Sequence, residues 1–87
     1  MTATLRLPRV LANVAKTGLV YQVEGKTLRE ALDDLFEKEP GLRGHLVDET
    51  GRLRDHVSMF VDRDQSDLGT RVDDGVEIRV LQAVSGG

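Results

Sequence analysis

Residues 27–41 read TLREALDDLFEKEPG, and this stretch decides the fold. Its apolar residues fall three or four positions apart, which is the spacing of one face of an amphipathic helix: Leu28, Ala31, Leu32, Leu35 and Phe36. Thr27 and Glu30 form a capping box, in which the Thr27 side chain accepts from the Glu30 N–H and the Glu30 side chain reaches back to the Thr27 N–H. Pro40-Gly41 ends the pattern. The sequence therefore predicts one strong helix with a single apolar face.

Segments in which apolar and polar residues alternate lie on both sides of this helix. Such alternation is typical of strands with one buried face. The predicted strands cover residues 2–7, 19–24, 57–61 and 76–80. The first two form a hairpin whose long connection, residues 9–18, is predicted to be ordered. Residues 63–65 predict a polar turn, and Leu68 is placed in a short edge strand.

These elements define an α+β fold. Because one amphipathic helix can bury only one side of one sheet, the prediction is a roll with a mixed sheet of four or five strands and one main helix on one face. The length of 87 residues fits a single domain over residues 1–87, in which residues 82–87 form a flexible C-terminal tail.

Composition excludes several classes of protein. The chain has no cysteine, which excludes disulfide scaffolds, zinc fingers and thiol nucleophiles. A net charge of −3 and only 3% aromatic residues argue against nucleic-acid binding. No apolar run approaches the roughly 20 residues of a membrane span, and no signal peptide precedes the first strand. We therefore expect a cytoplasmic protein that binds neither nucleic acid nor membrane.

The polar residues do not form a recognisable catalytic or metal-binding motif. His45 and His56 are eleven positions apart and share no periodic face. The adjacent carboxylates Asp33-Asp34 and Asp73-Asp74 diverge, on a helix and in a turn respectively, so neither forms an acid/base pair. We therefore expect no catalytic residue, no metal site and no tightly bound cofactor, and the chain is not expected to be an enzyme.

The end of the chain is its most unusual feature. Val84-Ser85-Gly86-Gly87 follows the last strand almost directly. Glycines lack a Cβ, so an enzyme could draw the Gly87 carboxylate into a narrow channel. A terminal carboxyl with a pKa of about 3.5 is ionised at neutral pH and is a poor electrophile. Adenylation with ATP would convert it to a reactive acyl group that sulfide or a thiolate could attack.

The pattern resembles the MoaD/ThiS family of ubiquitin-like sulfur carriers. The resemblance lies in the strand–strand–helix–strand order, the Asp74-Gly75-Val76-Glu77-Ile78 turn and the final Ala83-Val84-Ser85-Gly86-Gly87. It implies a β-grasp fold and a Gly87 that is adenylated and then converted to a thiocarboxylate. Many members have proline in place of Gln82 and Asn-Gly in place of Asp62-Arg63, so the resemblance does not define a subfamily.

The resemblance also implies partners. These are an activating enzyme of the ubiquitin-activating type, which uses ATP, and a sulfur-accepting enzyme of cysteine, molybdopterin, thiazole or thiosugar synthesis. Gly86, Ser85 and Val84 would lie in the partner's groove. Two alternatives remain: a protein modifier that joins Gly87 to target lysines, and a noncovalent interaction module whose tail is incidental.

A docking patch is predicted independently of the tail. Phe60 and Leu81 are out of phase with the core-facing residues of their strands, so both should point away from the helix. Two apolar residues on an exposed sheet face suggest a surface for a partner protein. The net charge of −3 would favour a basic partner site, but it is too small to establish one.

Overall fold

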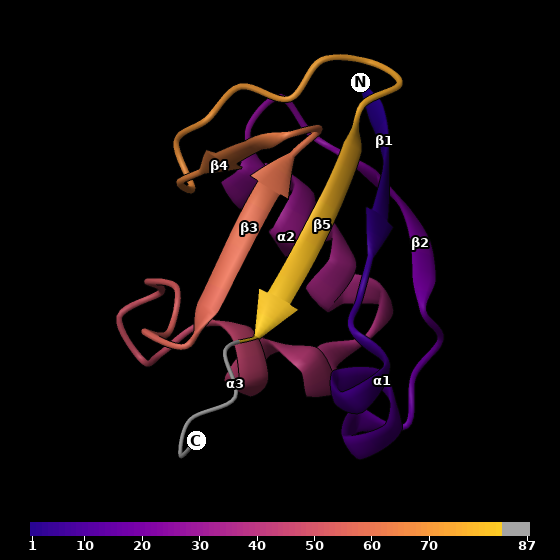
Figure 1. The fold of residues 1–87 in the computed structure, drawn as a ribbon, viewed down its shortest axis with the longest axis vertical. Coiled ribbons are helices and arrows are strands. Elements are labelled where there is room, and N and C mark those ends of the chain that lie inside the picture. Colours follow the sequence, from indigo (N-terminus) through magenta and orange to yellow (C-terminus); the bar gives the residue numbers. More distant parts are fainter. Residues whose placement is uncertain (83–87) are drawn as a thin grey trace.

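The computed structural model describes residues 1–82, and its five strands form one mixed sheet (Figure 1). The strands are β1 (Thr2–Arg6), β2 (Val20–Glu24), β3 (Val57–Val61), β4 (Asp64–Ser66) and β5 (Glu77–Gln82). They lie in the order β2-β1-β5-β3-β4. β1 and β5 are parallel, and the other neighbours are antiparallel. The predicted mixed sheet is therefore confirmed, with five strands.

The main helix packs on one face of this sheet, as predicted (Figure 1). The helical segments are α1 (Arg9–Ala15), α2 (Leu28–Lys38), the 3-10 turn η1 (Pro40–Leu42) and α3 (Arg43–Leu46). All five apolar positions of the predicted helical face are buried in α2. Together with residues of the strands they form one hydrophobic core, and no polar or charged residue among residues 1–82 is buried. The sheet and α2 confirm the predicted β-grasp architecture.

The segment between β1 and β2 contains a helix that the sequence did not predict. Residues 9–18 are predicted only as an ordered connection, and most of them form α1. Pro8 precedes the helix, and Lys16 ends it in the left-handed conformation with a φ of 59°. Only Leu11 and Ala12 of α1 are buried. A helix of seven residues with two buried positions has no apolar repeat long enough to recognise.

The start of α2 confirms half of the capping box. The Thr27 hydroxyl accepts from the Glu30 N–H at 3.2 Å, as expected. The return bond is different, because the Glu30 carboxylate accepts from the Lys26 N–H at 2.9 Å instead of from Thr27. The long Glu30 side chain thus reaches one residue further back and still satisfies a backbone donor next to the helix start.

The segment after β4 also caps α2. The edge strand is Asp64–Ser66, so the predicted polar turn begins one residue earlier than expected, and the placing of Leu68 in the strand is wrong. Leu68 instead follows the strand, and its carbonyl accepts from the Arg29 N–H at 3.0 Å. The Thr70 carbonyl accepts from the Leu28 N–H at the same distance. These carbonyls satisfy donors that the first turn of a helix leaves free.

Four strand ends meet at the end of the sheet from which the chain continues to residue 83. β5 and β1 finish there, while β2 and β3 begin there. α1 and α3 lie at the same end, and the N-terminus lies at the opposite one (Figure 1). We call this end of the molecule the exit end.

Candidate functional site

The tail residues predicted to carry the chemistry, Val84, Ser85, Gly86 and Gly87, lie outside the described residues. Their roles therefore stay predictions. Gln82 was assigned to the tail, but it is the last residue of β5 and lies opposite Val57 of β3. The hydrogen-bonded sheet therefore continues up to Gln82, and five residues follow it in the sequence.

The two residues of the predicted docking patch both lie on the face of the sheet that α2 does not cover. β3 and β5 pair so that Phe60 is opposite Arg79 and Leu81 is opposite Ser58. Since side chains alternate along each strand, all four point away from the core. Leu81 is 45% exposed and Phe60 is half-buried. They sit on neighbouring strands, two residues apart in register and on the same face, so one partner surface could contact both.

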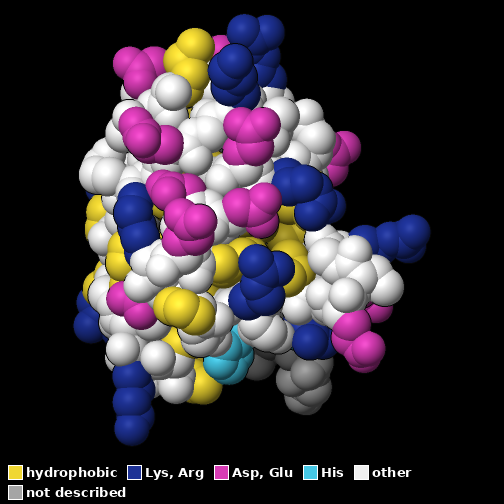
Figure 2. Space-filling view, turned by 180° about the vertical axis from the view of Figure 1, so that it is seen from behind, with side chains coloured by type: hydrophobic (Ala, Val, Ile, Leu, Met, Phe, Trp, Pro, Cys, Tyr) yellow, Lys and Arg dark blue, Asp and Glu magenta, His cyan; other side chains and the backbone are white. Residues whose placement is uncertain are grey.

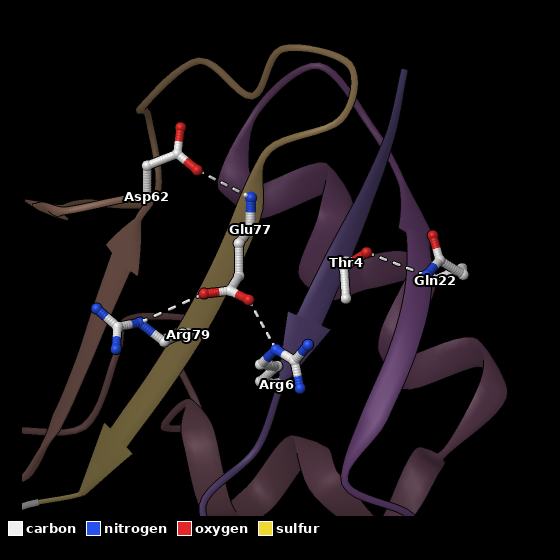
Figure 3. A network of polar contacts seen from close by, with 6 residues as sticks. All are labelled: Thr4, Arg6, Gln22, Asp62, Glu77 and Arg79. Carbon is white, nitrogen blue, oxygen red and sulfur yellow. Dashed lines mark hydrogen bonds and ion pairs between the residues drawn. The ribbon is translucent and has the colours of Figure 1, made fainter.

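A polar network borders this patch on the same face. The Arg6 guanidinium of β1 contacts the Glu77 carboxylate, with Nε and Oε2 2.7 Å apart, and Arg79 Nε lies 3.8 Å from the other oxygen (Figure 3). On the neighbouring pair of strands, the Gln22 amide donates to the Thr4 hydroxyl at 3.0 Å. The ion pairs are exposed, so they contribute little to stability. They do place two guanidinium groups on either side of the Glu77 carboxylate, on the sheet face that also carries Leu81.

Asp62 fixes the turn that leads into β4. Its N–H donates to the Glu77 carbonyl at 2.7 Å, and its carboxylate accepts from the Glu77 N–H at 3.1 Å (Figure 3). Its φ of 54° is left-handed. Aspartate and asparagine tolerate this conformation better than other residues with a side chain. Asp62 therefore suits the left-handed conformation that this turn requires.

Two carboxyl groups have a displaced pKa, and both have structural partners. The Lys38 ammonium, 2.9 Å away, and the Glu24 N–H lower the pKa of Asp34. Lys38 also donates to the Gln22 carbonyl at 2.6 Å, so Asp34 and Lys38 tie α2 to β2.

The second displaced carboxyl belongs to a loop. Hydrogen bonds from the Thr50 hydroxyl and the Arg52 N–H lower the pKa of Asp48. Both shifts favour the ionised form, which is the form that accepts these bonds. Neither group is placed as a proton donor for catalysis.

The remaining titratable residues do not converge. His45 is half-buried in α3, and His56 is exposed just before β3. Within residues 1–82, no three His, Asp or Glu side chains are grouped so that they could hold a metal ion. None of the helices in this part of the chain is long and apolar enough to cross a membrane.

One surface was missed from the sequence. Val10 and Val14 of α1 are 68% and 64% exposed. Next to α1, a hollow of about 300 Å³ is lined by Arg6, Leu7, Arg9, Leu19 and Val20. The signal was present in the sequence as two valines four positions apart, but it has meaning only once residues 9–15 are known to be helical.

Comparisons with known proteins agree on one family. Residues 9–87 match the ThiS family. No curated protein matches the chain. Among solved structures, SAMP1 from Haloferax volcanii superposes with a TM-score of 0.88 at 28% identity, and the match covers all of both chains.

Two further structures match over nearly the full length. A chain of the Amycolatopsis orientalis BexX/CysO complex has a TM-score of 0.86 at 26% identity, covering 98% of this chain and 99% of that one. Mycobacterium tuberculosis CysO, an antigen, has a TM-score of 0.83 at 25% identity, covering 94% and 99%. The fold is thus the ubiquitin-like β-grasp of these neighbours.

Proposed function

The chain belongs to the ThiS family, and from this premise we propose that it is a sulfur carrier whose Gly87 carboxylate is activated by a partner enzyme. The observation that carries the proposal is the family match, which extends to residue 87 and so includes the final diglycine. The chain itself is the substrate and carrier, and it contributes no catalytic group.

The proposed chemistry has two steps. In the first, a Gly87 carboxylate oxygen attacks the α-phosphorus of ATP, which gives an acyl adenylate and releases pyrophosphate. In the second, hydrosulfide attacks the acyl carbon, the bond to AMP breaks, and the products are the Gly87 thiocarboxylate, AMP and a proton. ATP is used by the activating enzyme and is not a resident cofactor of this chain.

The described residues support a role as a rigid platform for this reaction. β5 is hydrogen-bonded to β1 on one side and to β3 on the other. Its last residue, Gln82, stands five positions before Gly87. A chain spans at most about 3.3–3.6 Å per residue, so these five residues could carry Gly87 roughly 17 Å into a partner. Glycine at the last two positions permits close approach within a narrow site.

The partners follow from this chemistry. We propose an activating enzyme that adenylates Gly87 and a biosynthetic enzyme that accepts the sulfur, with Phe60 and Leu81 contacting each of them. The BexX/CysO complex supports such docking, since it contains a similar protein together with a partner. We also propose a cytoplasmic location, because the reaction consumes ATP. The pathway stays open among cysteine, molybdopterin, thiazole and thiosugar synthesis.

A second function is favoured by one comparison. SAMP1 from Haloferax volcanii, to which the chain is similar, is a small archaeal modifier protein. A modifier would use the same adenylate, but a lysine ε-amine would attack the acyl carbon and release AMP, which leaves an isopeptide bond. The third possibility, a noncovalent interaction module, needs no reaction at Gly87.

Deletion of Gly87 tests the proposal against the noncovalent module. The assay is ATP–pyrophosphate exchange with the activating enzyme of the same cells. The deletion variant still ends in a glycine carboxylate, that of Gly86, but one residue short. We expect exchange with the full chain and its loss in the deletion variant, with unchanged thermal melting. The absence of exchange with the full chain would eliminate both the carrier and the modifier.

A further inference from the structure

Charge is unevenly distributed over this acidic chain. The net charge is −3, yet the first 23 residues contain Arg6, Arg9 and Lys16 and neither Asp nor Glu. These residues form β1, α1 and most of β2, which meet at one corner of the exit end. Acidic side chains gather elsewhere, as on the helix side of the molecule in Figure 2, where Glu30, Asp33 and Glu37 of α2 are exposed. Two carboxylates from other parts of the chain reach this region, Glu77 beside Arg6 and Glu39 beside Tyr21, so the positive charge that they leave at this corner is that of Arg9 and Lys16.

The same corner exposes apolar side chains. Within the described residues six large hydrophobic side chains are exposed, and all except Met1 lie at the exit end: Val10, Val14, Leu19, Val20 and Leu81. Val10 and Val14 are one helical turn apart on α1. Leu19 and Val20 line the hollow of about 300 Å³ together with Arg6, Leu7 and Arg9. We define the α1 surface as Arg9, Val10, Val14, Lys16, Leu19 and Val20.

This surface lies close to the start of the tail. β1 lies between β2 and β5 in the sheet. The parallel register of β1 and β5 places Arg6 opposite Arg79. Two residues after Arg6, Pro8 follows β1 and precedes α1. Two residues after Arg79, Leu81 precedes Gln82, the last residue of β5. An enzyme that receives residues 83–87 therefore has to approach the end of the molecule that carries the α1 surface.

We propose that the α1 surface is a second contact for the activating enzyme, which meets it with apolar side chains flanked by Asp and Glu. This inference rests on the proposed function and adds the chemistry of the partner's site. Within residues 1–82, the side chains of Arg9 and Lys16 take part in no ion pair or hydrogen bond, so both are available to carboxylates of the partner. The partner site at this corner is thus acidic, whereas the net charge alone would favour a basic one.

Charge reversal with a matched control tests the proposal. The test variant is Arg9→Glu with Lys16→Glu. The control is Lys26→Glu with Arg63→Glu, which has the same net charge but alters exposed residues away from the exit end. The measurement is the KM for each chain in ATP–pyrophosphate exchange with the activating enzyme, at low and at high salt. Thermal melting checks that both variants fold.

The α1-surface variant should raise KM by about tenfold or more at low salt, and the difference should shrink at high salt because salt screens exposed charges. The control should change KM by less than about twofold, since its charges lie away from the contact. A third variant, Val10→Ser with Val14→Ser, should raise KM at both salt concentrations.

Three results would overturn the proposal. The first is an unchanged KM in the α1-surface variant. Because the wild-type chain would still support exchange, this result would refute the proposed contact and would not refute the proposed function. The second is a change in what the wild-type chain binds through the α1 surface. If the wild-type chain sediments as a dimer and the α1-surface variant does not, the surface binds a second copy of the chain. If the wild-type chain sediments with vesicles of phosphatidylcholine and phosphatidylserine and the variant does not, the surface binds an anionic membrane. The third is the absence of exchange with wild-type chain, which would refute the proposed function as well.

Discussion

At the scale of single residues, Asp62 shows how one side chain can fix a turn. Its backbone and its carboxylate both bond to the backbone of Glu77, while its φ of 54° is left-handed. The sequence indicated only a polar turn at residues 63–65. It did not indicate that the turn comes one residue earlier than predicted, because the bond to Glu77 spans fifteen positions.

Asp62→Ala should destabilise the fold by about 1–2 kcal/mol, because it removes a hydrogen bond and leaves a residue with a Cβ in a left-handed conformation. Asp62→Asn keeps an acceptor oxygen and suits this conformation, so it should cost less than about 0.5 kcal/mol. Urea unfolding measures both. Equal losses in the two variants would show that the Glu77 bond has no effect on stability.

Asp34 gives the fold a dependence on pH. Its folded pKa is lowered below the usual 3.8, mainly by Lys38 and the Glu24 N–H. The stabilisation is therefore fully present at pH values well above 3.8 and is lost as the pH falls through the lower folded value. Urea unfolding measures the free energy of unfolding of the wild type and of Asp34→Asn from neutral to acidic pH. The difference between the two proteins should become smaller as the pH falls.

Asp33→Asn is the control for that series. The Asp33 carboxylate is exposed and has no hydrogen-bond partner among residues 1–82. Its removal should leave the acid dependence of stability close to that of the wild type. A stability difference for Asp34→Asn that does not change between neutral and acidic pH would contradict the role given to the Lys38 contact.

At the scale of elements, the sequence predicted those that have a long apolar repeat. α2 has five buried positions and was predicted with its core-facing residues correct. α1 has two, so its helical nature was missed. β4 consists of Asp64, Gln65 and Ser66, none of which has an apolar side chain, so only its pairing with β3 defines it as a strand. Such elements depend on contacts that a sequence pattern does not contain.

Leu32→Ala tests the α2 face. Leu32 is 2% exposed, and its truncation should cost about 2–5 kcal/mol in the free energy of unfolding. Glu37→Ala, at an exposed position of the same helix, should change stability by less than about 0.5 kcal/mol. A loss below roughly 1 kcal/mol for Leu32→Ala would mean that the core is not built on this helix face.

At the scale of the whole molecule, the fold separates a stable platform from the residues proposed to react. The core residues of the described part lie between Ala3 and Val80. The orientation of Phe60 and Leu81 could be predicted because strands alternate with a period of two. The α1 surface could not, because it combines residues of α1 and β2 that only the folded chain brings to one corner.

Removal of residues 83–87 should therefore leave the platform intact. We expect the free energy of unfolding to change by less than about 0.5 kcal/mol, since the few residues at a chain end contribute little to core burial. Chemical denaturation of the full chain and of a chain ending at Gln82 provides the comparison. A loss of several kcal/mol would show that the last five residues are part of the folded core and are not free to enter a partner.

The proposed sulfur-carrier function depends on the chemical state of Gly87 in the cell. Mass spectrometry of the chain isolated from its own cells tests this function, with fragmentation to locate any change. A sulfur carrier should yield a population in which one terminal oxygen of Gly87 is replaced by sulfur. Branched peptides with Gly86-Gly87 on target lysines and no thiocarboxylate, or a polypeptide that continues past Gly87, would contradict it.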